Sequence, residues 1–244
     1  MSATPQQLAD VLRPVKHVLL DFDGPVCSVF AGLPAPEVAR RLREALLAAG
    51  EQGPAGAEDE SDPLALLRLV ADARPDLTES TDAALAALET EAVRAARPTP
   101  GGESVLRACA RSGRLVSVVS NNAGAAIEGY LAEHGLGDYV AGVFGRAPGD
   151  PSSMKPNPRL LLEAMEAAGA GPEHCIFIGD ATRDVEAGEA VGVPTIGYAN
   201  KPGKDARLAA AGAVAIVHSM ELVAEGLLGV TPGSGLEWRG RGCD

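Results

Sequence analysis

The chain has 244 residues, of which 46% are hydrophobic and 22% are charged, a balance typical of a folded globular protein. Its 33 Asp and Glu outnumber its 21 Lys and Arg, and the formal net charge of −12 disfavours a nucleic-acid surface or a polybasic membrane anchor. No stretch is long and apolar enough to span a bilayer, and residues 1–10 lack the basic-then-apolar order of a secretory signal. The four Cys form no CxxC pair, so we expect a cytoplasmic protein with free thiols and with neither nucleic-acid nor membrane partners.

Short apolar segments of strand length recur along the chain, and each ends at a polar or Gly-containing segment. These segments are His17–Leu20, Leu115–Val119, Cys175–Ile178, Pro194–Tyr198 and Ala213–Val217. Their Val, Ile and Leu residues follow one another without polar alternation, which indicates strands that are covered on both faces. Because helical segments separate the strands between residues 101 and 228, the pattern predicts βαβ units and an α/β fold with a parallel sheet.

The stretch 31–97 has a helical periodicity throughout. Its apolar residues recur at helical spacing in the segments Pro36–Ala49, Pro63–Ala73 and Ser80–Ala96, with no strand between them. Asp62, just before the second segment, is typical of a helix start. We therefore expect a core formed by 1–30 and 98–230, an all-helical insertion at 31–97, and a loose Gly-rich tail at 231–244.

Polar residues stand directly after three of the predicted strands and before one predicted helix. They are Asp21, Asp23, Ser120, Asn121, Lys155, Asp180 and Asp184. Open parallel sheets bind their ligands outside the carboxyl ends of the strands, so these side chains are expected to meet in one crevice. Crowded carboxylates repel one another and need a cation, and an all-oxygen ligand set favours Mg²⁺. A carboxylate can attack phosphorus, and a hydroxyl and an ammonium group suit the remaining phosphoryl oxygens.

The order of these motifs resembles that of the haloacid dehalogenase (HAD) superfamily of phosphohydrolases. The matching segments are DFDG at 21–24, SNN at 120–122, KPNP at 155–158 and GDATRD at 179–184. The resemblance covers roughly residues 16–218 and is strongest to members of the phosphoglycolate phosphatase type, which have a helical cap after the first motif. It implies a HAD-like Rossmannoid core with an all-α cap, and a Mg²⁺-dependent phosphomonoesterase acting on a small phosphorylated metabolite through an aspartyl-phosphate.

The resemblance assigns roles to the first motif and also reveals a departure from it. Asp21 is implied to be the nucleophile and a metal ligand, and Asp23 to be the general acid and base, with its backbone carbonyl on the metal. Pro25 stands where the family usually has Thr or Val, and Cys27 and Ser28 stand where many members have a further Asp. Because Pro lacks an N–H and fixes φ, we expect Pro25 to affect the cap hinge more than the chemistry.

The other motifs receive roles in the same way. Ser120 is implied to bind the transferring phosphoryl group, and Lys155 to balance the charge of the nucleophile and the phosphoryl group. Asn121 is expected either to help bind phosphate or to cap the following helix. Asp180 is implied to be an acidic metal ligand, and Asp184 either a second ligand or a partner of the ligands.

Other activities known in the superfamily differ in these residues. A dehalogenase generally lacks the second Asp of the first motif, and a phosphonatase uses a cap lysine, whereas this chain has Asp23 and no Lys between 31 and 97. A phosphosugar mutase retains all four motifs and remains the enzymatic alternative. A catalytically silent binding module is the alternative from another class. For the basic loop 200–204, contact with an anionic substrate is one interpretation and a solvated loop is the preferred one. No pattern indicates an oligomeric state.

Overall fold

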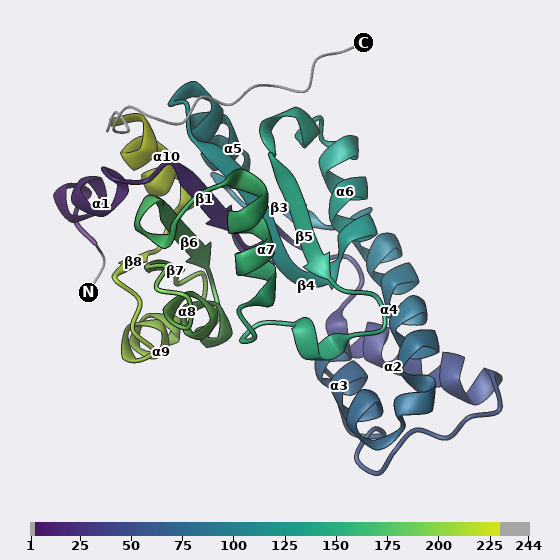
Figure 1. Ribbon diagram of the computed structural model, residues 1–244. Helices are drawn as coiled ribbons and strands as arrows, with labels where there is room; N and C mark the ends of the chain where they lie inside the picture. The colour runs from purple at the N-terminus through teal and green to yellow at the C-terminus, as the bar shows by residue number, and fades with distance from the viewer. Residues whose placement is uncertain (1–2, 230–244) are drawn as a thin grey trace.

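The computed structural model describes residues 3–229, and a six-stranded sheet lies at its centre (Figure 1). The strands of this sheet are β1 (His17–Leu20), β4 (Leu115–Ala123), β5 (Gly142–Arg146), β6 (Cys175–Gly179), β7 (Thr195–Tyr198) and β8 (Ala215–Val217). Their order across the sheet is β5-β4-β1-β6-β7-β8, and every neighbouring pair is parallel. The prediction of an α/β fold with a parallel sheet is therefore confirmed.

Helices cover both faces of the sheet. They are α1 (Pro5–Leu12), α5 (Gly102–Arg111), α6 (Gly124–Glu133), α7 (Arg159–Ala168), α8 (Thr182–Glu189), α9 (Lys204–Ala210) and α10 (Met220–Gly229). Val18 and Leu20 of β1 pack with α1, α5, α6 and α10, whereas Leu19 packs with α7 and α8. Successive strand side chains point to opposite faces, which explains why β1 is apolar throughout. Within residues 3–229, no helix combines the length and hydropathy needed to cross a bilayer.

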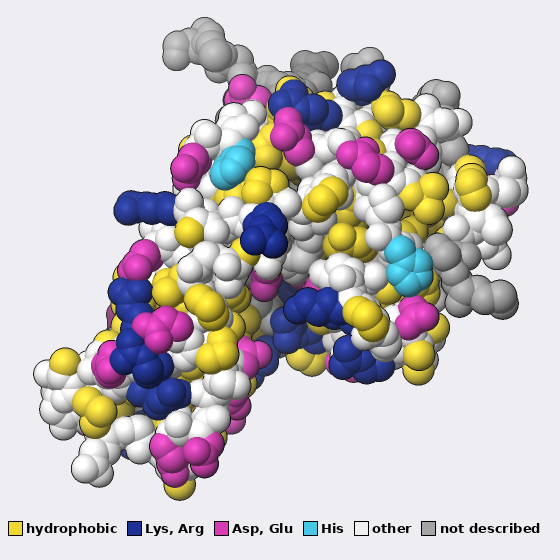
Figure 2. Space-filling view, turned by 180° about the vertical axis from the view of Figure 1, so that it is seen from behind, with side chains coloured by type: hydrophobic (Ala, Val, Ile, Leu, Met, Phe, Trp, Pro, Cys, Tyr) yellow, Lys and Arg dark blue, Asp and Glu magenta, His cyan; other side chains and the backbone are white. Residues whose placement is uncertain are grey.

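The chain between β1 and β4 contributes a lobe of three helices, α2 (Ala35–Ala48), α3 (Pro63–Ala73) and α4 (Thr78–Val93). Asp62 begins α3 as expected, since its carboxylate accepts hydrogen bonds from the first backbone N–H groups of the helix. The three helices bury a hydrophobic cluster of their own, and Met154 of the core joins it. Figure 1 shows the lobe beyond the carboxyl ends of β4 and β5, and Figure 2 shows a hollow between lobe and core.

Several short elements give little periodic signal in the sequence. Strand β5 lies at the sheet edge and contains two Gly, so it lacks a continuous apolar run. Strands β2 (Cys27–Ser28) and β3 (Arg97–Pro98) pair antiparallel where the chain leaves the core and returns to it. The 3₁₀ helices are Pro75–Leu77, Gly137–Tyr139, Pro151–Ser153 and Pro172–His174.

The division into core, cap and tail stays a prediction, and the predicted tail at 231–244 lies outside the described residues.

A buried ion-pair network fastens α4 to the core. The Arg146 guanidinium, at the end of β5, donates to Asp82 at 2.5 Å and to the two carboxylate oxygens of Glu89 at 3.2 and 3.1 Å. Asp82 also accepts from the backbone N–H of Gly149 at 2.8 Å. All three charged side chains are buried, so moving α4 away from the core would leave charges unpaired in a low dielectric.

We expect Glu89→Gln to destabilise the protein strongly, because it leaves the buried Arg146 with one carboxylate partner fewer. Breaking such a pair costs about 3–5 kcal/mol in the free energy of unfolding, measured by urea denaturation. Glu91→Gln is the matched control on the same helix, because Glu91 pairs with Arg41 at the surface. It should change the free energy of unfolding little. Equal, small effects of the two substitutions would show that the network does not fasten α4.

Candidate active site

The predicted site residues lie at the carboxyl ends of the central strands. Asp21 directly follows β1, Ser120 lies near the end of β4, and Asp180 directly follows β6. Because β4 and β6 flank β1 on opposite sides, the three strand ends are adjacent. The sheet order reverses at this point, which is where open α/β sheets bind ligands.

The ammonium group of Lys155 lies buried among the strand ends. Its Nζ is 2.8 Å from Oδ1 of Asp21, 2.8 Å from Oδ1 of Asp184, and 3.0 Å from the backbone oxygen of Val119. The contact with Val119 is a hydrogen bond, whereas the contacts with Asp21 and Asp184 are ion pairs. Burial lowers the pKa of Lys155, but the carboxylates of Asp184 and Asp21 outweigh it and raise the pKa above its ordinary value. Lys155 is therefore a fixed positive charge beside Asp21.

Asn121 holds the backbone of Lys155 in place. Its Nδ2 donates to the Lys155 carbonyl at 3.2 Å, and its Oδ1 accepts from the Lys155 N–H at 2.8 Å. Arg68 of α3 donates to the same carbonyl at 2.8 Å, which links the helical lobe to the site. These contacts favour a positioning role for Asn121, and its predicted contact with phosphate stays a prediction.

The carboxylate of Asp21 is buried but keeps one oxygen unengaged. Its Oδ1 accepts from the Phe22 N–H at 2.8 Å and faces Lys155, and no hydrogen bond from residues 3–229 reaches its Oδ2. Burial raises the pKa of Asp21 to about 7; Lys155 opposes the shift, and the neighbouring carboxylates of Asp184 and Asp180 add to it. The ionised form of Asp21 would thus gain from a further cation.

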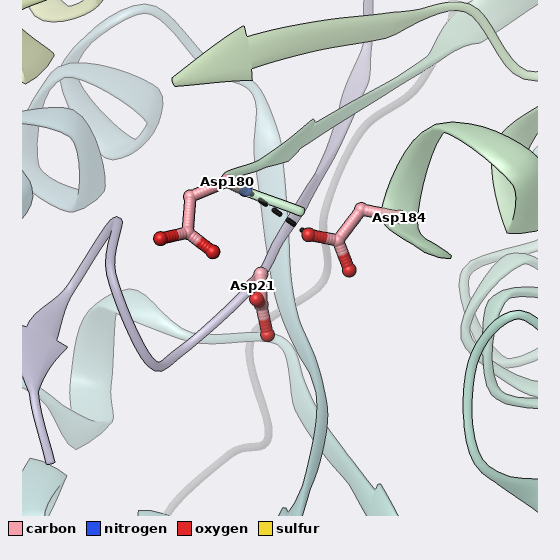
Figure 3. Close-up of side chains that lie close together, drawn as sticks. All are labelled: Asp21, Asp180 and Asp184. Carbon is pink, nitrogen blue, oxygen red and sulfur yellow. Dashed lines mark hydrogen bonds between the residues drawn. The ribbon is translucent and has the colours of Figure 1, made fainter. Parts of the chain in front are cut away.

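Three carboxylates converge on a common space and could hold that cation. Oxygen atoms of Asp21, Asp180 and Asp184 lie within 4.8 Å of one another. Figure 3 shows the three side chains converging from the ends of β1 and β6 and from the beginning of α8. The set contains oxygen donors alone, without His or Cys, which suits a hard cation such as Mg²⁺ better than a softer metal such as Cu⁺ or Zn²⁺. The residues present therefore fit the divalent metal that the motifs imply.

The three carboxylates are not equally free to bind a metal. Oδ2 of Asp184 accepts from the N–H group of Asp180 at 3.0 Å (Figure 3) and from that of Ala181 at 3.0 Å. Its Oδ1 forms an ion pair with Lys155. Both oxygens of Asp184 are thus engaged in shaping the turn after β6 and in holding Lys155. This arrangement favours the second of its two expected roles, as a partner of the ligands.

Asp180 has two contacts that the sequence interpretation missed. Its Oδ2 accepts from Nδ2 of Asn200 at 2.8 Å and also contacts the ammonium group of Lys204. The loop 200–204 therefore borders the site through Asn200 and Lys204, while Lys201, Pro202 and Gly203 are exposed to solvent as expected. The position of the loop could have indicated these contacts, because the loop follows β7, which neighbours β6 in the parallel sheet.

The loop after Asp21 brings Asp23 close to Asp180. Asp23 accepts a hydrogen bond from the Val29 N–H at 3.0 Å; burial raises the pKa of its carboxyl group, while that bond opposes the shift. Gly24 has φ +113°, and a Cβ there would lie 2.6 Å from the carboxyl group of Asp180. Only glycine fits this turn, because both the backbone conformation and the close approach exclude a side chain.

The hydroxyl of Ser120 is held by its own turn. Its Oγ lies 3.2 Å from Oδ1 of Asn122 and accepts from the Asn122 N–H at 3.3 Å. Asn122 and Ala123 in turn donate to the Glu89 carboxylate of α4, at 3.0 and 2.9 Å. A carboxylate of the helical lobe thus holds the turn that follows Ser120, the residue predicted to bind the phosphoryl group.

Comparison with protein families and curated sequences gives consistent matches. Residues 15–192 match the model of the haloacid dehalogenase-like hydrolases. A phosphoglycolate phosphatase of Pseudomonas putida is 30% identical over 99 residues, covering 40% of this chain and 35% of that protein. A phosphoglycolate phosphatase of Photorhabdus laumondii is 24% identical over 192 residues, covering 77% and 81%. The matched part spans only 34–52% of the length of the first four relatives.

Solved structures share the fold at low sequence identity. A "predicted phosphatase" from Clostridium acetobutylicum has a TM-score of 0.65 and 19% identity, covering 88% of this chain and 99% of that one. A candidate β-phosphoglucomutase from Bacteroides vulgatus has a TM-score of 0.64 at 19% identity, with coverages of 93% and 99%. A HAD family hydrolase from Deinococcus radiodurans, solved with phosphate and sodium, has a TM-score of 0.57 at 22% identity, with coverages of 90% and 99%. At these identities the likeness concerns the fold alone.

The carboxylate set predicts that Mg²⁺ stabilises the folded protein, because the unfolded chain has no assembled site. At about 100 times its Kd, a ligand of the native state adds about 2.7 kcal/mol, so Mg²⁺ should raise the Tm in calorimetry. Asp180→Asn should abolish this rise, whereas Asp138→Asn, at an exposed position in the 3₁₀ helix Gly137–Tyr139, should retain it. An equal rise in wild type and Asp180→Asn would contradict the metal site.

Proposed function

The chain belongs to the haloacid dehalogenase-like hydrolases, and on that premise we propose that it is a Mg²⁺-dependent phosphomonoesterase. Its substrate is a small phosphorylated metabolite, and the reaction passes through an aspartyl-phosphate. The observation that supports this most strongly is the Asp21 carboxylate, which Lys155 orients through Oδ1 while Oδ2 stays unengaged. The phosphoglycolate phosphatases among the relatives support a phosphate monoester as substrate.

In the first step, Oδ2 of Asp21 attacks phosphorus and the bond from phosphorus to the leaving oxygen breaks. Asp23 donates its proton to that oxygen, so the product departs as a neutral alcohol; the raised pKa of Asp23 suits this role. Lys155 and Ser120 contact the phosphoryl oxygens and stabilise their charge. A bound Mg²⁺ would be held by Asp21, Asp180 and the backbone carbonyl of Asp23, and would supply additional positive charge there.

In the second step, water attacks the phosphorus of the aspartyl-phosphate. Asp23, now a carboxylate, accepts a proton from the water, and the bond from phosphorus to the Asp21 oxygen breaks. Inorganic phosphate leaves, Asp21 regains its carboxylate, and Asp23 is again protonated. One water is consumed for each ester cleaved.

The helical lobe is proposed to act as a cap over this chemistry. Arg68 of α3 contacts the loop of Lys155, and Glu89 of α4 contacts the loop of Ser120, so lobe and catalytic loops are joined directly. A cap over the strand ends would exclude bulk water while the leaving group departs. The enzyme would then consist of two functional domains, the core at 1–30 and 98–230 and the cap at 31–97.

Substitution of Asp21 tests its role as the nucleophile. Asp21→Asn should reduce the hydrolysis of 4-nitrophenyl phosphate to the background rate, because it removes the attacking oxygen and a metal-binding charge together. The substitution keeps the side chain's size, so circular dichroism should show a folded protein. Turnover near that of the wild type would contradict the role of Asp21.

Substitution of Asp23 tests its role as the acid that protonates the leaving group. Asp23→Asn should lower kcat/KM for an alkyl phosphate by about 10²–10⁴, because the departing alkoxide needs a proton. The loss for 4-nitrophenyl phosphate should be smaller, since its phenolate leaves without one. Equal losses for both substrates would contradict a leaving-group acid at Asp23.

Isotope labelling separates the hydrolase from the mutase alternative. In ¹⁸O-enriched water, a hydrolase releases phosphate that contains solvent oxygen, whereas a phosphosugar mutase transfers the phosphoryl group to a second sugar with little free phosphate. We expect labelled phosphate; efficient transfer between sugars without its release would favour the mutase.

A further inference from the structure

A cavity of about 350 Å³ opens beside the catalytic carboxylates, on the core side of the site. Its charged lining consists of Asp23, Asp180, Arg183, Lys201, Lys204 and Arg207. Figure 2 shows Lys and Arg side chains gathered over the region of α8 and α9, beside the hollow between core and lobe. Four of the six charged side chains are therefore cations, in a chain whose formal net charge is −12.

Most of these cations lack a carboxylate partner within the part of the chain that the structure describes. Lys204 contacts Asp180, whereas Arg183, Lys201 and Arg207 form no ion pair with any residue between 3 and 229. Elsewhere in the protein, surface arginines such as Arg159 do pair with acidic neighbours. Burial lowers the pKa of Arg183, but the carboxylates of Asp184, Asp21, Asp62 and Asp180 outweigh it and raise the pKa, so its charge is retained. The N–H groups of Arg183, Lys201 and Arg207 form no ion pair and can therefore donate to an anion in the cavity.

The position of Asp23 determines which part of a substrate enters this cavity. Asp23 lines the cavity and, in the proposed reaction, its carboxyl group protonates the leaving oxygen. The leaving alcohol must therefore lie on the Asp23 side, while the transferring phosphoryl group lies with Lys155. The cations thus face the body of the leaving group.

We propose that Arg183, Lys201 and Arg207 bind a second anionic group of the substrate. This inference rests on the proposed phosphatase function and narrows its substrate class to phosphate monoesters whose leaving alcohol has a carboxylate or a further phosphate. A neutral leaving group would desolvate the charged lining without compensation, so the cavity disfavours it.

The volume of this cavity and the lining of a second, larger cavity both favour this assignment. A cavity of about 350 Å³ lies at the small end of ligand sites and suits a leaving group of a few heavy atoms. A larger cavity of about 540 Å³ lies between α3 and the loop 149–157, but its lining includes none of the seven predicted site residues. Asp23, the proposed leaving-group acid, lines the smaller cavity and not the larger one.

The test compares substrates that differ in this second charge. The neutral reference is 2-hydroxyethyl phosphate, the carboxylate probe is phosphoglycolate, and the phosphate probe is ethane-1,2-diol bisphosphate. We expect wild-type kcat/KM to be higher for at least one anionic probe than for the reference, and the better probe identifies which anion the cavity accepts. Lys201→Gln and Arg207→Gln should each lower that ratio about tenfold, because each removes one charge-assisted contact.

The control is Arg111→Gln, an identical change of charge at an exposed position at the far end of α5. It should leave the ratio at its wild-type value. Absence of any preference for an anionic probe, or a ratio that the Lys201 and Arg207 double variant leaves unchanged, would overturn the inference while the phosphatase function stands. Failure to cleave all three probes and 4-nitrophenyl phosphate would overturn both.

Discussion

The burial of the Lys155 ammonium group is the constraint on which the rest of the site depends. A buried charge is tolerated only where it is paired, and here the ammonium group forms ion pairs with Asp21 and Asp184 and a hydrogen bond to the Val119 carbonyl. These residues belong to the end of β1, to β4 and to the beginning of α8. One ammonium group therefore ties three neighbouring segments together and fixes the orientation of the Asp21 carboxylate.

The supports of this arrangement extend into the helical lobe. Asn121 and Arg68 hold the backbone of Lys155, and Glu89 receives hydrogen bonds from the turn after Ser120 and pairs with Arg146. Side chains of the lobe thus complete the hydrogen bonding of the loops that contain Lys155 and Ser120. In this structure α4 is fastened to the core through buried charges, so cap movement would involve the rest of the lobe more than this helix.

Features that depend on neighbouring residues in the chain could be predicted from the sequence. Strand ends such as Asp21 and Asp180 were predictable, because an apolar run followed by acidic residues identifies both the strand and its functional end. The pairing of Glu89 with Arg146 was not, since the two are 57 residues apart and only tertiary packing brings them together. The same holds for Lys204, whose contact depends on β7 lying beside β6. Strand β5 was missed because an edge strand needs less apolar surface.

The central claim is that Asp21 becomes covalently phosphorylated during turnover. Rapid acid quenching of the enzyme with a phosphate monoester, followed by digestion and mass spectrometry, locates the phosphoryl group directly. The account predicts a hydroxylamine-sensitive phosphopeptide that contains Asp21 and is absent from Asp21→Asn. Turnover with no phosphoenzyme, or with the phosphoryl group on another residue such as Ser120, would contradict it.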